Sequence, residues 1–381
     1  MPTRRTVLLG ALAVGLSACT NPERGTAPTP ASTPTPSAGG SPSASAEPSA
    51  TPTGTPEPSP EGPLRVGEPQ EIITGLTTPW GVRALDQDRL LVSERDTGQI
   101  KLVQGGAATS VGEVAGVRAN NEAGLLGIEL SADQQTLFVY TTTSSDNRVL
   151  AYSFNGSAIA NPRVLLQGIP SAGIHNGGQL KLGPDGHLYI STGDASQRQQ
   201  AQNQQSVAGK ILRIATDGSI PGDNPFGNAV WSLGHRNVQG LTFAPNGDLW
   251  SAEFGEKSAD EINLIVRGGN YGWPDVEGNN GQRVPYLAPK KTWEPTATSS
   301  PSALAYARGN LWVAALMGHC LFQVPVNGTE LGEQVIHFQN RYGRIRAVTP
   351  WRDGIVFGSS NTDGRATPRA GDDRLLYLPL S

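Results

Sequence analysis

The chain has 381 residues and carries 29 lysines and arginines against 33 aspartates and glutamates, a formal net charge of −4. This balance excludes the strongly basic surface on which nucleic-acid binding depends, and no glycine-rich loop that opens a helix supports nucleotide binding. The 47 glycines, together with the lack of long amphipathic helical periodicity, favour an all-β protein with many turns.

An export signal is predicted for residues 1–18. Arg4 and Arg5 precede an apolar run at 7–16 that is too short to span a membrane. The sequence Leu-Ser-Ala-Cys that ends at Cys19 resembles the lipobox of bacterial lipoproteins, and the paired arginines resemble a twin-arginine signal. We therefore expect Cys19 to be lipidated. An ordinary cleaved signal with a chance cysteine is the alternative, and Sec or Tat export stays open.

Residues 19–63 are predicted to form a disordered tether that begins at the lipidated cysteine. The segment is almost wholly Pro, Ser, Thr, Ala, Gly and Glu and has no aromatic side chain, so it cannot bury a core. A flexible chain of this length reaches roughly 35–40 Å. The predicted location is extracytoplasmic, with a lipid anchor as the only membrane contact. Once Cys19 is acylated, Cys320 has no partner for a disulfide.

Residues 64–381 contain six copies of one pattern. Each copy has a short apolar strand, a turn rich in Asp, Asn or Gly, and a second apolar strand, and the Asp-Gly and Asn-Gly turns favour hairpins. The spacing of roughly 44–63 residues is near that of four-stranded propeller blades. The copies begin at Trp80, Leu125, Gly178, Val238, Pro301 and Ile345.

We predict one all-β domain, a six-bladed β-propeller of four-stranded antiparallel blades. The alternative is a solenoid, which would need tighter, more uniform repeats and capping ends. The ring is expected to close by pairing a terminal strand at 374–380 with a strand near residues 71–74.

Polar residues stand just before the first strand of five of the six copies. Equivalent positions of successive blades form a ring around a propeller axis, so we expect these side chains to meet at one mouth of the central channel. They are Glu122, His175, residues 235–237, residues 298–300 and residues 342–344, with Arg346 just inside the sixth strand.

These side chains suit redox chemistry on an anionic ligand. His175 can act as a general base near neutral pH, and Asp194, after the paired strand, can fix its tautomer. Arg236 is a permanent cation suited to a developing oxyanion. Arg344 and Arg346 alternate along a strand and are expected to face one side, where they can bind carboxylates. For each residue alone, the alternative is an ordinary polar group on a surface or turn.

Between residues 175 and 273 lie the motifs IHNGGQLKLGPDGHLYISTGD, AGKILRIATDGSIPGDNPF, SLGHRNVQGLTFAPNGDLWSAEFGEKSADEINLI and GGNYGWP. They resemble the soluble-type PQQ-dependent sugar dehydrogenases, the glucose and aldose sugar dehydrogenase family. Weaker similarity extends over residues 68–380. The fold of that family is a six-bladed propeller, in agreement with the number of repeats.

The resemblance implies roles for the channel residues. His175 matches the family's catalytic base, which takes the proton from the C1 hydroxyl of the sugar, and Asp194 matches the carboxylate that orients this base. Arg236 and Asn237 match the pair that contacts the quinone oxygens, with Arg236 stabilising the charge that develops there. Glu122 and His175 are placed on the substrate side.

Cofactor and metal ligands follow from the same resemblance. Arg344 and Arg346 match the pair that binds the carboxylates of PQQ. Gly255 and Glu256 sit where backbone carbonyls hold a Ca²⁺ ion that also coordinates PQQ, in keeping with the oxygen ligands of this cation. A second, structural Ca²⁺ site is implied at Asp260, Glu261 and Tyr271.

The chain departs from the family at three of these positions. Met317 stands where the family usually places a lysine against the cofactor, which removes one positive charge, and His319 or Arg341 is a candidate to replace it. Phe254 stands at a polar cofactor contact of some members. Glu122 replaces a glutamine of glucose-type members, which changes the substrate side.

We expect a PQQ- and Ca²⁺-dependent enzyme that oxidises aldose sugars at C1 to lactones and passes the electrons to an external acceptor. Two alternatives stay open. One is a non-catalytic propeller that binds carbohydrate or protein, which Met317 motivates and which His175 and Arg236 oppose. The other is a metal-dependent lactone hydrolase, which would need several carboxylates or amides around an axial metal.

Overall fold

The computed structural model describes residues 64–281 and 283–381. The signal expected at 1–18, the lipidation of Cys19 and the tether at 19–63 lie outside the described residues, so they stay predictions. Within the described part of the chain, no helix is long and apolar enough to cross a membrane.

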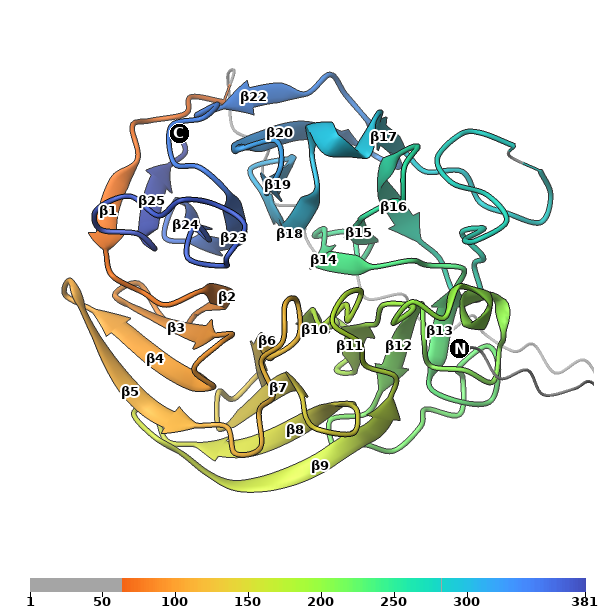
Figure 1. Cartoon of the computed structure of the whole chain (residues 1–381), viewed down its shortest axis with the longest axis horizontal. Coiled ribbons are helices and arrows are strands. Elements are labelled where there is room, and N and C mark those ends of the chain that lie inside the picture. Colours follow the sequence, from red (N-terminus) through yellow and green to blue (C-terminus); the bar gives the residue numbers. More distant parts are fainter. Residues whose placement is uncertain (1–63, 282) are drawn as a thin grey trace, which may run out of the picture. The chain divides into compact units, whose positions relative to one another are not determined.

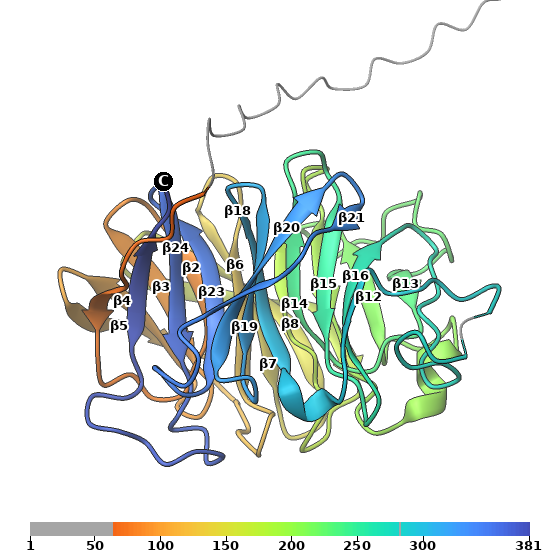
Figure 2. The same cartoon turned by 90° about the horizontal axis from the view of Figure 1, so that it is seen from above.

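Six antiparallel sheets are arranged around a central axis (Figure 1). Each sheet contains one copy of the repeated pattern, so the predicted six-bladed β-propeller is confirmed. The first strand of each copy lies nearest the axis and later strands lie progressively farther out (Figures 1 and 2). The loop before each innermost strand therefore opens toward the same end of the channel.

Blades 1 to 3 contain four strands each. Blade 3 also has a short 3₁₀ helix, η1 (Arg198–Gln202), between its second and third strands. From the axis outward, blade 1 is β2 (Pro79–Ala84), β3 (Arg89–Glu94), β4 (Gln99–Gln104) and β5 (Ala107–Glu113); blade 2 is β6 (Leu125–Leu130), β7 (Thr136–Thr142), β8 (Asn147–Phe154) and β9 (Ile159–Ile169); blade 3 is β10 (Leu180–Leu182), β11 (Leu188–Ser191), β12 (Lys210–Ile214) and β13 (Val230–Leu233).

Blades 4 to 6 vary this plan at their outer edges. In blade 5 two short strands both pair with the third strand. Blade 4 is β14 (Val238–Phe243), β15 (Leu249–Glu253), β16 (Asp260–Ile265) and β17 (Lys291–Trp293), followed by the 3₁₀ helix η2 (Thr296–Thr298); blade 5 is β18 (Pro301–Ala307), β19 (Asn310–Ala315), β20 (Cys320–Asn327), β21 (Glu330–Leu331) and β22 (Val335–His337); blade 6 is β23 (Ile345–Trp351), β24 (Gly354–Ser359), β25 (Leu375–Pro379) and β1 (Gln70–Ile73).

The ring closes in blade 6, where the first strand of the domain completes the last sheet. Strand β1 pairs antiparallel with β25, with Gln70 opposite Tyr377 and Ile73 opposite Leu375. The predicted closure is therefore confirmed. Because the two ends of the domain share one sheet, opening the ring would break this ladder as well as the apolar contacts between blades.

Replacing Trp312 with alanine is expected to lower the free energy of unfolding by about 3–5 kcal/mol, the usual cost of removing a large buried aromatic side chain. Trp312 on β19 is fully buried between blades 5 and 6, and its indole N–H donates to the Ala307 carbonyl at 3.2 Å. Denaturant unfolding measures the change. Val335→Ala is the control, because Val335 on β22 is 47% exposed. Equal costs for the two variants would contradict this packing.

Candidate active site

One pocket is lined by residues from five blades, and its cavity volume is about 240 Å³. The loops before the innermost strands of blades 2 to 6 each contribute, so the convergence expected from the repeats is found in the structure. The chemical roles of these residues stay predictions. The pocket is lined by Glu122, His175, Arg236, Phe254, Gly255, Asp260, Thr296, Ser300, Leu316, Met317, Arg344 and Arg365.

The backbone turns sharply at His175. Its φ is +59°, a left-handed conformation that is unfavourable for a residue other than glycine. Hydrogen bonds hold it there: the His175 N–H donates to Glu122 Oε2 at 2.9 Å, and its carbonyl accepts from the Ala195 N–H at 3.1 Å. Gly177 follows with φ +62°, and a Cβ on it would lie 2.5 Å from the backbone of Thr192. Glycine at position 177 is thus required by close backbone approach.

Asp194 fixes the imidazole ring of His175. Its Oδ1 lies 2.8 Å from His175 Nδ1, and its Oδ2 accepts from the Trp273 indole N–H at 2.9 Å. Burial alone would raise the pKa of Asp194, but the hydrogen bonds from His175 and Trp273, with that from the Ser196 N–H, bring this pKa below its usual value. An ionised carboxylate only accepts, so Nδ1 carries the proton and Nε2 is left to accept one.

His235, the other histidine in a glycine-rich motif, is a buried residue that supports its neighbours through hydrogen bonds. It is fully buried, its Nδ1 lies 2.8 Å from Glu253 Oε2, and its Nε2 lies 2.9 Å from the Ser232 hydroxyl. Glu253 also accepts from the backbone N–H of Arg236. Both nitrogens of His235 therefore have partners, and the ring orients the loop that carries Arg236.

Arg236 places a cation beside His175 in the pocket. One terminal nitrogen donates to the Phe254 carbonyl at 3.3 Å, and the guanidinium stacks over the Trp273 ring at 5.5 Å. Within the described residues no carboxylate forms an ion pair with it. Trp273 thus contacts both Arg236 and Asp194, a role that the sequence motif GGNYGWP did not reveal.

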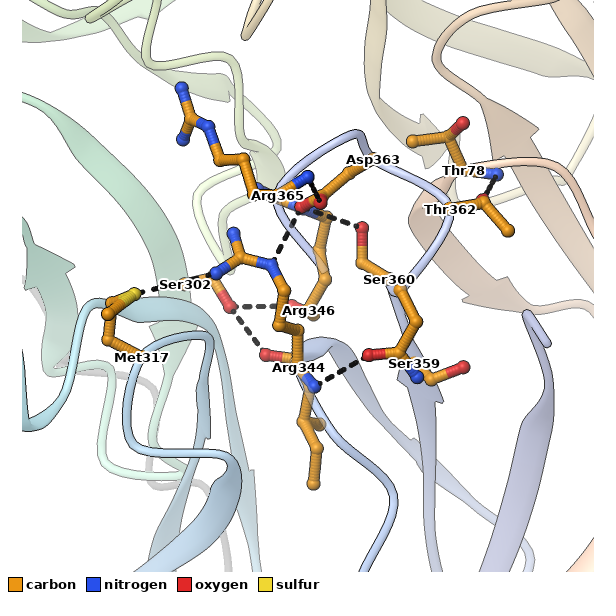
Figure 3. Close-up of polar contacts among 12 residues, drawn as sticks. Thr78, Ser302, Met317, Arg344, Arg346, Ser359, Ser360, Thr362, Asp363 and Arg365 are labelled. Carbon is orange, nitrogen blue, oxygen red and sulfur yellow. Dashed lines mark hydrogen bonds and ion pairs between the residues drawn. The ribbon is translucent and has the colours of Figure 1, made fainter. Parts of the chain in front are cut away.

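Arg344 and Arg346 have separate environments. Arg344 Nε donates to Asp363 Oδ2 at 2.9 Å, and its terminal nitrogen lies 3.7 Å from the Met317 sulfur, as Figure 3 shows. Arg346 bonds to Gln239 at 2.8 Å and does not line the pocket. A bulge interrupts the register between Ile345 and Ala347, and the expectation that the two arginines bind carboxylates on one side stays a prediction. Burial lowers the pKa of Arg346 to about 9.

Unsatisfied donors gather among the predicted cofactor residues. Of the buried side-chain nitrogen and oxygen atoms in the described residues, seven have no hydrogen-bond partner, and three of these are Arg236 Nε, Asn237 Nδ2 and Arg346 Nε. Asn237 is fully buried and uses only its Oδ1, which accepts from the Gly177 N–H at 3.0 Å. Buried donors normally have acceptors, so this clustering indicates a ligand rich in acceptors.

The residues predicted to bind metal do not form one cluster. Gly255 and Asp260 line the pocket, but Asp260 already accepts from the Gly255 and Ser300 N–H groups and the Ser299 hydroxyl. Burial raises the pKa of Asp260 to about 6. In the described residues, no group of three or more His, Cys, Asp or Glu side chains is arranged to hold a metal.

Glu261 and Tyr271 lie in a second, smaller pocket that also contains Glu253 and Glu277. Burial, then the nearby carboxylates of Glu253 and Glu277, raise the pKa of Glu261. The Tyr271 hydroxyl is used elsewhere, since it donates to the Leu264 carbonyl at 2.7 Å and accepts from the Val266 N–H at 2.9 Å. The Tyr271 hydroxyl is therefore engaged with backbone groups, and the metal-binding role of Tyr271 stays a prediction.

The residues that differ from the family pattern lie mostly in the pocket. Met317 and Phe254 line it, whereas His319 and Arg341, the two candidates for the missing positive charge, do not. The cation that the sequence reasoning missed is Arg365, in the loop between β24 and β25. This loop joins the second and third strands of blade 6, as the loops that carry Phe254 and Met317 do in blades 4 and 5, but it does not match them in length or sequence.

The glucose/sorbosone dehydrogenase family model matches residues 76–368. The chain belongs to this family. The predicted family and enzyme class are thereby confirmed. Among solved structures, the chain is similar to the PQQ-bound form of an aldose sugar dehydrogenase from Streptomyces coelicolor, with a TM-score of 0.80 and 39% identity over 84% of this chain and 99% of that one.

Two curated relatives extend the comparison. Quinoprotein glucose dehydrogenase B of Acinetobacter calcoaceticus is 36% identical over 249 residues, which cover 54% of this chain and 52% of that protein, so the match spans about half of the relative's length. Aldose sugar dehydrogenase YliI of Escherichia coli is 29% identical over 322 residues, 74% of this chain and 86% of that protein.

Proposed function

We propose that this enzyme binds PQQ in the pocket lined by blades 2 to 6 and that it oxidises aldose sugars at C1 to lactones. The observation that carries the proposal is that Arg236, which lines the pocket, and the adjacent Asn237 both have a buried donor without a hydrogen-bond partner. A quinone with several carboxylates offers the acceptors that these buried groups lack. The PQQ-bound relative from Streptomyces coelicolor supports the same ligand.

Arg236, Asn237 and Arg344 are residues that fit PQQ, whereas Met317 is not. Arg236 and Asn237 would face the quinone oxygens, and Arg344, at the pocket wall, would face a carboxylate. Arg346 lies deeper and stacks over Trp80 at 5.7 Å. Met317 supplies no charge where the family has a lysine, and we expect weaker binding than a lysine would give.

When bound, PQQ supplies the two-electron acceptor that takes the hydride from C1 of the sugar. His175 Nε2 removes the proton of the C1 hydroxyl, while Asp194 holds the ring in the tautomer that makes this possible. Arg236 stabilises the negative charge that develops next to it. The products are the lactone, two electrons that leave through an external acceptor, and two protons.

We propose that Ca²⁺ binds next to PQQ, at the loop that begins after β15. Gly255 and Glu256 lie in this loop, and within the described residues their carbonyl oxygens accept no hydrogen bond. Free carbonyls fit a hard cation. The second site is proposed at Asp260, Glu261 and Tyr271, and the carboxylates of Glu253 and Glu277 share a pocket with Glu261 and Tyr271.

We also propose that the domain works outside the cytoplasm, held to the cell membrane by lipid on Cys19. The support is the lipobox-like sequence and the tether composition of residues 19–63. Metabolic labelling with a fatty acid, compared between the native chain and Cys19→Ala, tests the anchor.

Adding PQQ and Ca²⁺ to the purified domain is expected to raise its melting temperature and to start sugar-dependent dye reduction. Ligand at 100 times its Kd stabilises the folded state by about 2.7 kcal/mol. The measurements are thermal unfolding, PQQ absorbance and dye reduction with a panel of aldoses. If the melting temperature, the PQQ absorbance and the rate of dye reduction all stay unchanged, the proposal is contradicted and a non-catalytic binding module is favoured.

A further inference from the structure

The loop between β24 and β25 reaches the pocket with two charged residues of opposite sign. Asp363 bonds to Arg344, and two residues later Arg365 extends away from that pair, as Figure 3 shows. Gly364 separates them with φ +82°, a left-handed turn suited to glycine. One short turn of blade 6 thus contacts two different sides of the pocket.

Arg365 contacts the loop of blade 2 that carries Glu122. Its terminal nitrogen donates to Asn121 Oδ1 at 2.6 Å and to Glu122 Oε1 at 3.0 Å. The Arg365 side chain is 38% exposed, whereas that of Glu122 is 10% exposed. The arginine therefore lies at the pocket rim and the carboxylate lies within it.

Glu122 connects this contact to the base. Its second oxygen, Oε2, accepts from the backbone N–H of His175, the residue in the left-handed conformation. The two carboxylate oxygens thus have separate partners, Arg365 on one side and His175 on the other. A glutamine here would offer one acceptor oxygen instead of two, so the carboxylate is what lets Glu122 accept from both partners at once.

We propose that Arg365 is a positioning residue that acts through Glu122 to hold the backbone of His175, and with it the direction of Nε2, on the substrate side of the pocket. Arg365 spans from blade 6 to blade 2, and Glu122 spans from blade 2 to blade 3. Neither residue contacts Arg344 or Met317 through a hydrogen bond within the described residues. The hydrogen bonds of the pair therefore lead to the base and not to the residue at the lysine position.

This inference rests on the proposed function, so its test uses the PQQ- and Ca²⁺-loaded enzyme with an active wild type. Arg365→Gln is expected to lower kcat roughly tenfold. This value lies between the effect of losing a part-exposed ion pair, which is a few-fold, and the ~100-fold loss caused by a misplaced catalytic group. Arg365→Lys, which keeps the charge, should recover most of this loss. The affinity for PQQ, measured by absorbance titration, and the melting temperature should stay unchanged.

Variants of Glu122 test the route of the effect. Glu122→Ala should lose at least as much kcat as Arg365→Gln, and Glu122→Gln should lose less because it keeps an acceptor for the His175 N–H. Adding Arg365→Gln to Glu122→Ala should change kcat by less than about twofold, the behaviour of two residues that act as a unit. Arg352→Gln is the matched control, since Arg352 is equally exposed and pairs with Asp88 at the far end of the β23–β24 hairpin.

Three results separate the outcomes. A wild type that is inactive with every aldose overturns the proposed function itself. An active wild type with unchanged kcat in Arg365→Gln overturns the positioning role. Weaker PQQ binding in Arg365→Gln, with kcat at saturating PQQ unchanged, also overturns it and assigns Arg365 to the cofactor.

Discussion

Replacing His175 with alanine is expected to lower kcat by about 10²–10⁴-fold, the range that a positioned general base contributes. The reason is that Nε2 is the free nitrogen of a ring whose other nitrogen is held by the ionised Asp194 at 2.8 Å. PQQ affinity should not change, since the donors proposed for the cofactor belong to other residues. Steady-state kinetics and an absorbance titration with PQQ measure the two quantities.

His187→Ala is the matched control for His175→Ala. His187 also lies in blade 3 and near a carboxylate, with its Nδ1 at 3.3 Å from Asp185, but at the opposite end of the β10–β11 hairpin. Its replacement should leave kcat unchanged. Loss of PQQ binding in His175→Ala would refute the role of His175 as base and would make it a cofactor ligand.

Replacing Asp194 with asparagine is expected to lower kcat by up to about 10⁴-fold, as when the carboxylate of a His–Asp pair becomes an amide. The carboxylate accepts from donors at both oxygens: His175 and the Ser196 N–H at Oδ1, and Trp273 at Oδ2. The NH₂ group of an asparagine would therefore face a donor in either orientation. The conflict leaves a buried group unsatisfied or forces His175 into the wrong tautomer.

The asparagine variant is also expected to be less stable by about 1–3 kcal/mol, the cost of an unsatisfied buried polar group. Asp185→Asn is the control for kcat, because Asp185 has a similarly hydrogen-bonded carboxylate, in contact with Arg213 and Tyr189, but lies outside the pocket. Kinetics at saturating PQQ and denaturant unfolding separate the two effects. Wild-type kcat in Asp194→Asn would contradict the assignment of the proton to Nδ1.

The sequence was sufficient for the propeller and for most of the pocket because both follow from the repeated hairpin. Once the copies are superposed, Glu122, His175, Arg236 and Arg344 occupy equivalent positions, and rotation about the axis brings them together. The closing pair of strands, β1 and β25, was also predictable because it completes a blade that otherwise has three strands.

The features that the sequence did not reveal depend on irregular backbone. Arg365 and Asp363 lie in the loop between β24 and β25, whose length and sequence differ from those of the corresponding loops of blades 4 and 5, and a bulge that no turn residue marks falls between Ile345 and Ala347. The Tyr271 hydroxyl bonds to nearby backbone groups, a contact that its motif does not predict. Such contacts depend on three-dimensional loop paths, which hydrophobic patterns do not encode.

The most direct test of the proposed chemistry is a single turnover without any added electron acceptor. The purified domain is loaded with PQQ and Ca²⁺, an aldose is added under anaerobic conditions, and the cofactor spectrum and the lactone are measured together. We expect reduction of the bound cofactor and formation of lactone in an amount equal to it, with neither in His175→Ala. Bound PQQ that stays oxidised with every aldose, in a wild type that binds it, would contradict the proposed mechanism.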